Sequence, residues 1–474
     1  MTDYNIVIVC LDTFRWDLLN HRGPWEVALP HLDALRQESV EYMNAYGEAQ
    51  PTIPMRRAYF TGQRSFPWRF TYDTEGMWPT GRGWHKIPPE QKTLAETLLD
   101  CGYHTGLISD TYHMFKPTMN FTRGFLSYEF VRGYESDNFR GGIVTPDALR
   151  PYVRDPIPAK HPVLTQYLLN TRSRQEERDW LTAQVFERAQ SWIVDHKGAE
   201  PFMLWIDSFG PHEPWDPPRS YVDPVYGKYA GIEFIYPYGM KETQLRAEEA
   251  ERIRHLYLGY LSFVDHWVGE FINRLKSEGL WDRTIFMVVS DHGTELLDHG
   301  RFSKHQANLF AHNTQLIWTV RHPEHRRRIE VTDFVQSHDL YPTVLRLLNV
   351  DAAAVSGQNV WPGESSQDRA VRDWIVTGWG NYASVRDSRW NYIVNFEDPG
   401  ADERLYHLES DPGESTDVSQ DHRGVVHAMR LRLESVLQQP LPAILADAVK
   451  PGVAPIRRYY QSSVSQDKAD SGFV

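Results

Sequence analysis

Continuous apolar runs, rich in β-branched residues, recur along the chain, and each is followed by polar or charged residues. They cover residues 5–11, 103–108, 202–206, 284–290 and 316–320. Runs of this length and composition are typical of strands that are buried on both faces of a sheet. Between them, apolar positions recur at helical spacing, most clearly over residues 173–196 and 248–278. The alternation predicts an α/β domain with a sheet between layers of helices.

The pattern changes towards the C-terminus, where short apolar runs are separated by Asp, Gly and Asn. These runs cover residues 374–377, 392–395 and 404–408. They predict a small antiparallel sheet, followed by a helix over residues 425–437. We therefore expect a catalytic domain, an antiparallel subdomain and a C-terminal tail, over residues 1–365, 366–440 and 441–474. The tail has no strong pattern and is either disordered or an arm through which a homo-oligomer forms.

The segment 115–171, rich in Gly, Pro, Asp and aromatic residues, shows little periodicity and predicts long loops over the active face. The net charge of −13 argues against a nucleic-acid partner. No apolar run approaches the roughly 18 residues of a membrane span, and the first residues lack the basic start of a signal peptide. We therefore expect a cytoplasmic protein without a membrane partner. Cys10 and Cys101 are interpreted as small hydrophobic side chains, not as a disulfide.

One stretch, residues 50–62, carries candidate chemistry. Thr52 lies two residues before Pro54 and four before Arg56. Proline suits the first turn of a helix, and Gly62 can end it. A hydroxyl at a helix N-terminus is close to unpaired N–H groups that favour an anion, and Arg56 lies one turn further on. The stretch predicts an oxyanion site with Thr52 as nucleophile; a capping threonine before a surface helix fits it equally well.

Polar residues that follow the predicted strands are further candidates. Asp12 follows the first strand, His212 lies in the loop after the third, and Asp291 and His292 follow the fourth. Because the carboxyl ends of parallel strands meet at one edge of a sheet, these side chains are expected to gather there. An ordinary turn aspartate or loop histidine is the alternative at each position.

The stretch around Thr52 resembles the signature of the sulfatase family in the alkaline phosphatase superfamily. Sulfatases have Cys or Ser, any residue, Pro, any residue and Arg, followed by Thr-Gly at a fixed distance. The matching residues here are Thr52, Pro54, Arg56, Thr61 and Gly62. Further similarities lie in residues 211–214, 291–293, 298–304, 338–345 and 405–414. The resemblance implies a large mixed, mostly parallel sheet between helices, with a small C-terminal antiparallel sheet plus helix.

The chain departs from that signature at several positions. Sulfatases oxidise the Cys or Ser to formylglycine, and threonine cannot follow that route. Threonine nucleophiles are typical of phosphodiesterases and phosphoryl-group transferases of the same superfamily. Thr13 takes the place of a second aspartate, Asp110 takes the place of a lysine of the sulfate pocket, and His113 is displaced by one residue from the family's histidine.

The resemblance implies one divalent metal ion, with the ligands Asp12, Thr52, Asp291 and His292. Calcium prefers six or more oxygen ligands, whereas an imidazole in the set favours manganese or zinc over calcium. His305 and His312 leave the number of metals open, and we interpret both as surface residues. The resemblance also implies that Arg56, Lys304 and His212 stabilise the negative charge that develops on the substrate during the reaction. His212 or His299 would protonate the leaving oxygen, and substrate contacts are expected from His299, His113 and Tyr112.

These observations lead to a hypothesis: a metal-dependent hydrolase of small anionic esters of phosphate or phosphonate, acting through a covalent intermediate on Thr52. A sulfuric ester hydrolase without formylglycine is one alternative. A transferase, or a non-catalytic binding protein on the same fold, are alternatives of other classes.

Overall fold

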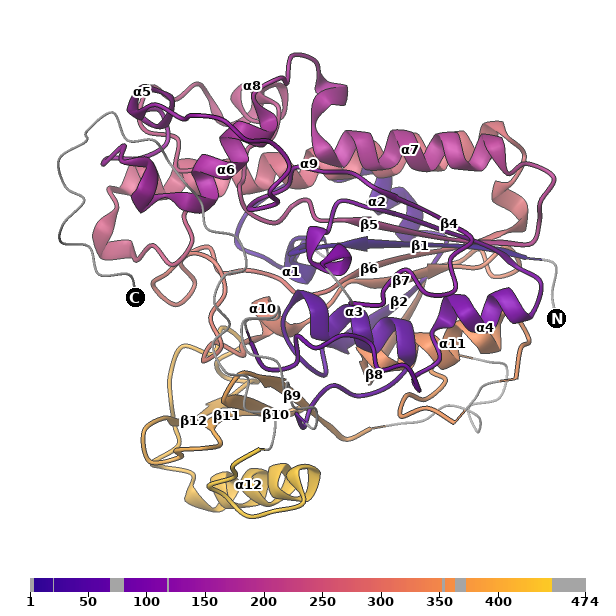
Figure 1. The fold of residues 1–474 in the computed structure, drawn as a ribbon. Helices are drawn as coiled ribbons and strands as arrows, with labels where there is room; N and C mark the ends of the chain where they lie inside the picture. The colour runs from indigo at the N-terminus through magenta and orange to yellow at the C-terminus, as the bar shows by residue number, and fades with distance from the viewer. Residues whose placement is uncertain are drawn as a thin grey trace.

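The computed structural model describes residues 4–19, 21–68, 81–116, 119–351, 354–362 and 372–445. Its main part is an eight-stranded sheet with helices on both faces (Figure 1). The strands are β1 (Asn5–Leu11), β2 (Val40–Tyr46), β3 (His104–Ser109), β4 (Ser127–Phe130), β5 (Phe202–Ser208), β6 (Thr284–Ser290), β7 (Trp318–Arg321) and β8 (Ile329–Gln336). Their order across the sheet is β4-β3-β5-β1-β6-β7-β2-β8.

Strand β1 lies at the centre and pairs in parallel with both β5 and β6. Only β7 runs against its neighbours, β6 and β2. The predicted large mixed, mostly parallel sheet is therefore confirmed. Its consequence for function is that β1, β3, β5 and β6 all end at the same edge.

Alternate residues of β1 explain why the whole strand is apolar. Val7, Val9 and Leu11 belong to the hydrophobic core on one face of the sheet. Ile6, Ile8 and Cys10 belong to the core on the other face, and all six side chains are fully buried. Cys10 is thus a buried hydrophobic residue, as expected, and both described cysteines are free thiols.

Helices α2, α7 and α9 cover one face, and α3, α4 and α11 cover the other (Figure 1). The helices are α1 (Trp16–Leu19), α2 (Pro30–Arg36), α3 (Thr52–Thr61), α4 (Leu94–Asp100), α5 (Pro146–Leu149), α6 (Pro162–Thr171), α7 (Leu181–Asp195), α8 (Asp223–Tyr226), α9 (Ala247–Ser277), α10 (Ala311–Thr314), α11 (Leu340–Leu347) and α12 (Arg423–Leu437). Among the described residues, no helix is both long and apolar enough to cross a bilayer.

Some elements differ from the predictions. The segment 115–171 is not all loop, because it contains β4, α5 and α6, and the helix expected from residue 173 begins at Leu181. Strand β2 was missed because Glu41 interrupts its apolar pattern. That carboxylate is buried, and it is neutralised by Arg36 at 2.5 Å and Arg328 at 2.8 Å.

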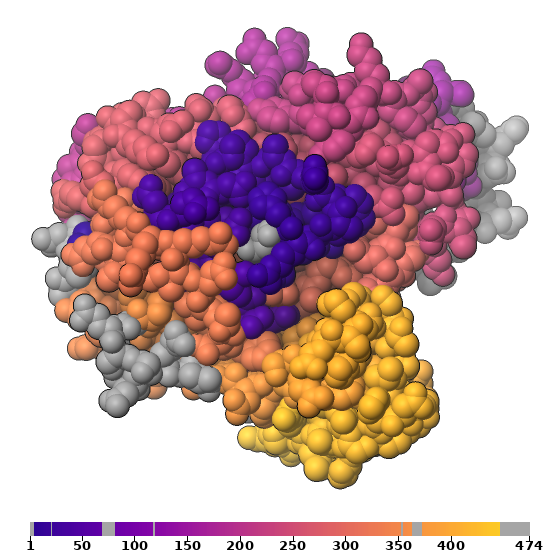
Figure 2. All heavy atoms as spheres, turned by 180° about the vertical axis from the view of Figure 1, so that it is seen from behind, coloured from indigo at the N-terminus to yellow at the C-terminus, as the bar shows by residue number. Residues whose placement is uncertain are grey.

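The C-terminal part forms a second sheet, which with α12 makes a separate lobe (Figures 1 and 2). Its strands run antiparallel in the order β12-β11-β10-β9. They are β9 (Trp374–Trp379), β10 (Tyr382–Asp387), β11 (Trp390–Asn395) and β12 (Glu403–His407). Gly378 of β9 exchanges backbone hydrogen bonds with Glu48 and Gln50, just before α3. The predicted boundary at residue 365 and the tail beyond residue 445 lie outside the described residues.

Candidate active site

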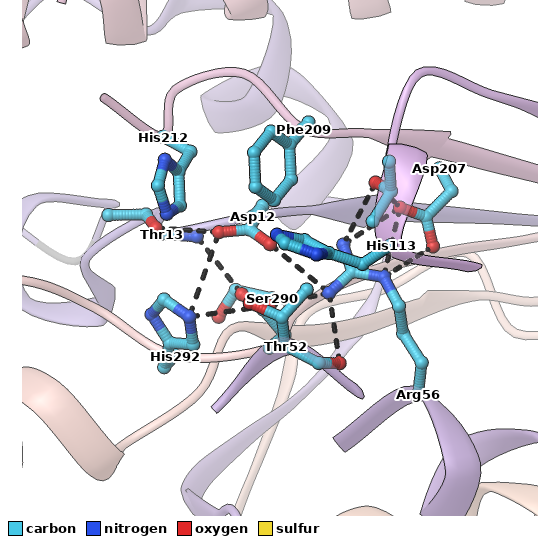
Figure 3. A network of polar contacts seen from close by, with 12 residues as sticks. Asp12, Thr13, Thr52, Arg56, His113, Asp207, Phe209, His212, Ser290 and His292 are labelled. Atoms are coloured by element: carbon cyan, nitrogen blue, oxygen red, sulfur yellow. Dashed lines mark hydrogen bonds and ion pairs between the residues drawn. The ribbon is translucent and has the colours of Figure 1, made fainter. Parts of the chain in front are cut away.

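Two adjacent strands bring the predicted metal ligands together. Leu11 at the end of β1 is in register with Ser290 at the end of β6, so Asp12 emerges beside Asp291 and His292. Figure 3 shows Asp12 and His292. All three side chains are buried, and their potential ligand atoms lie within 4.8 Å of one another. The sequence pattern therefore placed these three residues correctly at one edge of the sheet.

The orientation of His292 points to a cation. Its Nδ1 lies 2.8 Å from the carbonyl oxygen of Gly293, so Nδ1 carries the proton and Nε2 carries a lone pair. Nε2 has no hydrogen-bond partner in the described chain, and it faces Asp291 Oδ2 at 3.5 Å and Asp12 Oδ1 at 3.7 Å. Burial lowers the pKa of His292 to about 3, so the ring is neutral. Three acceptors that face one another in a buried site fit a shared metal ion.

The charge of the cluster fits a divalent ion. Asp12, Asp207 and Asp291 surround the guanidinium of Arg56, and all four side chains are buried. Three carboxylates and one guanidinium leave two negative charges, which a divalent cation would neutralise. Burial, together with the charge of Asp291, raises the pKa of Asp12 well above its usual value. Repulsion between the neighbouring carboxylates contributes to this raised pKa, and a divalent ion between them would oppose it.

Arg56 has a different role from the predicted contact with substrate. Its Nε donates to Asp207 at 3.0 Å, and its Nη2 donates to Asp207 at 2.8 Å and to Thr111 Oγ1 at 3.4 Å. Its Nη1 donates to Asp291 Oδ2 at 2.6 Å and to the Thr52 carbonyl at 3.2 Å. Every N–H group of the guanidinium is therefore engaged, and Arg56 holds the carboxylates of Asp207 and Asp291 in place. Asp207, which sequence reasoning missed, is its main partner.

Thr13 supports both carboxylates instead of replacing one as a ligand. Its N–H donates to Asp291 Oδ1 at 3.0 Å, and its hydroxyl donates to Asp12 Oδ1 at 2.6 Å. Its φ of 64° is a left-handed conformation that a β-branched residue rarely adopts, at a price of about 1–3 kcal/mol. The hydroxyl of Tyr257 donates to the Thr13 carbonyl at 2.8 Å and holds this turn.

Thr52 is the first residue of α3, and it is drawn between His292 and Arg56 in Figure 3. Every residue of this ten-residue helix is buried. The N-cap is Pro51, and Gly62 ends the helix with a φ of 63°, as predicted. The alternative of a capping threonine before a surface helix is therefore wrong. Thr52 instead lies at the buried N-terminus of this helix, and its carbonyl shares Arg56 Nη1 with Asp291 Oδ2.

His212 and Lys304 both lie close to the buried carboxylate of Glu213. The His212 ring stacks on Phe209, with 4.3 Å between ring centroids, and its Nδ1 donates to the Glu213 carbonyl at 2.6 Å. Burial and the charge of Lys304 lower the pKa of His212, which leaves a neutral ring with its lone pair on Nε2. Lys304 Nζ is buried, has no hydrogen-bond partner within the described ranges, and lies 3.8 Å from Glu213 Oε2. Although burial opposes its charge, Glu213 and Asp12 raise the pKa of Lys304, so it stays cationic.

Aromatic residues and a neutral carboxyl line the rest of this region. The centroid of the His113 ring lies 4.0 Å from that of Tyr112 and 5.8 Å from that of Phe209. Burial lowers the pKa of His113. The Tyr112 hydroxyl donates to Glu135 at 2.7 Å. Asp110 Oδ1 accepts from the N–H of Phe209 at 2.6 Å, and burial raises the pKa of Asp110 to about 8. The residue in the place of the family lysine is thus uncharged near neutral pH.

His299 has none of the residues around Asp12 and His212 among its contacts described below. The geometry therefore does not favour the predicted contact between His299 and substrate. Its ring stacks on Phe310, with 3.7 Å between centroids, and its Nε2 donates to the Glu414 carbonyl at 3.1 Å. It therefore faces the C-terminal subdomain. His305 is exposed, as expected, but Nε2 of His312 is buried, contrary to the prediction of a surface residue.

Comparison with known proteins decides the family, because a sequence model described as Sulfatase matches residues 4–350. The chain belongs to the sulfatase family. It is 23% identical over 480 residues to arylsulfatase K of Rattus norvegicus, covering 92% of this chain and 78% of that protein. It is 26% identical over 453 residues to an arylsulfatase of Clostridium perfringens, covering 87% and 90%. This sulfatase-family chain is therefore an ester hydrolase.

Several solved structures share this fold. A phosphonate monoester hydrolase of Agrobacterium radiobacter superposes with a TM-score of 0.69 at 20% identity, covering 91% of this chain and 95% of that one. A second phosphonate monoester hydrolase, from Silicibacter pomeroyi, gives 0.66 at 20% identity, covering 92% and 96%. BT4656, solved with D-glucosamine-2-N,6-O-disulfate, gives 0.69 at 15% identity, covering 92% and 98%. The shared fold spans nearly the whole chain in each comparison.

Proposed function

We propose that this sulfatase-family hydrolase cleaves esters of phosphate or phosphonate, with Thr52 as its nucleophile. The observation that carries the proposal is the buried position of Thr52 at the start of α3. Its carbonyl shares Arg56 Nη1 with Asp291 Oδ2, and Figure 3 draws Thr52 near His292. A threonine hydroxyl is a secondary alcohol and cannot give the aldehyde hydrate of formylglycine. Its oxygen can still attack phosphorus directly.

The metal site supports this chemistry. Asp12, Asp291, His292 and the Thr52 hydroxyl would hold one divalent ion, and the imidazole favours manganese or zinc over calcium. Such an ion, when bound, lowers the pKa of a hydroxyl and polarises a phosphoryl oxygen.

The surrounding side chains supply the remaining steps. The Thr52 oxygen bonds to phosphorus while the bond between phosphorus and the ester oxygen breaks. In the same step, Nε2 of the neutral His212 accepts the proton of the Thr52 hydroxyl. The Lys304 ammonium holds the negative charge and protonates the leaving alkoxide, which departs as an alcohol. Water then attacks phosphorus and gives a proton to the neutral amine of Lys304, while the Thr52 oxygen leaves and takes back the proton held by His212. Both side chains return to their starting states, and phosphate or phosphonate is released. Lys304 takes the role of proton donor that the sequence assigned to His212 or His299, because the only N–H of a neutral His212 is already bonded to Glu213.

Sulfate esters are the second candidate, because the curated relatives named above are arylsulfatases at 23% and 26% identity. The same attack on sulfur would leave a sulfated Thr52. The uncharged Asp110 in place of the family lysine argues against this candidate, because it removes a cation that would bind sulfate.

The test compares the 4-nitrophenyl esters of sulfate, phosphate and phenylphosphonate, together with bis(4-nitrophenyl) phosphate, on protein loaded with manganese or zinc. We expect turnover of a phosphorus ester at least tenfold above that of the sulfate. Thr52→Ala should abolish turnover and Thr52→Ser should keep part of it. Thr61→Ser is the matched control, because Thr61 ends the same helix with its hydroxyl bonded to Arg57. Preferential turnover of the sulfate, or an active Thr52→Ala variant, would refute the proposal.

A further inference from the structure

A second group of metal-ligating side chains lies outside the active site. Glu295 belongs to the segment after β6, His299 lies four residues further on, and His312 belongs to α10. Glu295 Oε2, His299 Nδ1 and His312 Nε2 all have their atoms buried and without a hydrogen-bond partner in the part of the chain that the structure describes. One ligand atom from each residue lies within 4.8 Å of the others. The group shares no residue with the predicted catalytic metal site.

Neighbouring groups fix which atoms are free. The Nε2–H of His299 donates to the Glu414 carbonyl at 3.1 Å, so Nδ1 carries the lone pair. Glu295 Oε1 accepts from the side-chain amides of Asn308 and Asn313, which leaves Oε2 unused. Stacking on Phe310 keeps the His299 ring in this orientation. Hydrogen bonds of this kind, behind the ligand atoms, are typical of the outer shell of a metal site.

The spacing does not suit a direct hydrogen bond. His299 Nδ1 and Glu295 Oε2 are 3.9 Å apart, which is too far for a hydrogen bond, and both atoms are acceptors. Two ligands that each lie about 2.1 Å from one ion are separated by about 2.9–4.2 Å. The His299 and His312 rings lie nearly parallel, with 5.0 Å between centroids and 21° between planes.

The electrostatics of the group agree with this geometry. Burial raises the pKa of Glu295 to about 7 and lowers that of His312 to about 4. A cation held between Glu295 and the two imidazoles would stabilise the charged form of this carboxyl.

We propose that Glu295, His299 and His312 bind a second, structural transition-metal ion, with zinc as the preferred ion. Two imidazoles and one carboxylate are a ligand set for zinc, whereas calcium and magnesium prefer oxygen alone. The site joins the segment after β6 to α10, and its His299 ring also donates a hydrogen bond to the Glu414 carbonyl of the C-terminal subdomain. Glu414 completes that junction, because its Oε2 accepts from the N–H of Ala311 at 2.7 Å and its Oε1 from Arg386 at 2.6 Å. The bound ion stabilises the contact between the two sheets.

The test counts ions in the full chain after chelation and reloading with Zn²⁺, and follows Co²⁺ binding by its visible absorption. Wild type should bind two ions per chain, and His312→Gln and Glu295→Gln should each bind one. His305→Gln, an exposed neighbour, is the matched control and should bind two. Zn²⁺ should raise the thermal midpoint of a His292→Ala variant, which keeps only the second site, and His312→Gln added to that variant should remove the rise.

Circular dichroism of the metal-free variants checks that each is folded, and His299→Asn replaces His312→Gln if that variant is not. Equal ion counts in wild type and the folded second-site variants would overturn the proposal. A wild type that binds a single ion, lost on His292→Ala, would overturn it as well.

Discussion

Replacing Asp207 by asparagine tests the assignment of Arg56 to the carboxylates. Asp207 accepts from Nε and Nη2 of Arg56, from the Thr111 hydroxyl at 2.6 Å and from the Trp205 indole at 3.1 Å. Asparagine keeps one acceptor, but its amide N–H groups would face the guanidinium. Breaking one partner of a buried ion pair costs about 3–5 kcal/mol, and we expect a loss of that size in the free energy of unfolding.

The same change should weaken metal binding. With Asp207 neutral, the cluster around Arg56 loses one of the two net negative charges that a divalent ion would neutralise. Loss of a residue behind the metal ligands typically lowers metal affinity on the order of 10- to 100-fold, and we expect Asp207→Asn to fall in this range.

Chemical denaturation of the metal-free protein measures the first effect, and titration with Mn²⁺ or Zn²⁺ measures the second. Asp216→Asn is the matched control, because Asp216 lies in the segment after β5 and pairs with Arg174 at 3.0 Å, away from Asp12, Asp291 and His292. It should destabilise the fold less and leave metal affinity unchanged. An Asp207→Asn variant within about 1 kcal/mol of wild type in unfolding free energy, with unaltered metal affinity, would refute the reasoning.

Three further predictions concern single residues. Lys304→Ala should lower kcat/KM by about 100- to 1,000-fold, the size of one lost oxyanion donor, and a change within twofold in steady-state kinetics would place Lys304 outside the site. Because the pKa of Asp110 is raised to about 8, the folded state keeps this proton while the unfolded state loses it, so this residue's contribution to stability falls as pH rises from about 4 to about 8. Asp110→Asn should therefore gain stability over wild type across that window, and parallel curves of thermal midpoint against pH would contradict the raised pKa. Intact mass after a rapid quench should show an adduct of one phosphoryl or phosphonyl group that maps to Thr52 during turnover, while an adduct on another residue would exclude Thr52 as nucleophile.

The sequence by itself determined five strands of the sheet, the central ones among them, and the edge at which Asp12, Asp291 and His292 lie. Residues 5–11 and 284–290 were predicted as strands with the bounds that the structure has. The reason is local, because a strand buried on both faces must be apolar along its whole length. Once the strands are parallel and adjacent, Asp12 and Asp291 have to emerge side by side. The Thr52 helix was equally readable, since its start and its end at Gly62 depend on neighbouring residues.

Only the tertiary structure decided which polar groups satisfy one another. Asp207 lies 151 residues from Arg56 in the sequence, and nothing in the local pattern indicates that they pair. Glu41 is similar, because its burial in β2 depends on Arg328, 287 residues away. The position of His299 beside His312 depends on how the segment after β6 packs against α10. Apolar periodicity is a property of neighbouring residues, whereas compensation of buried charge is a property of the folded chain, and so only folding fixes it.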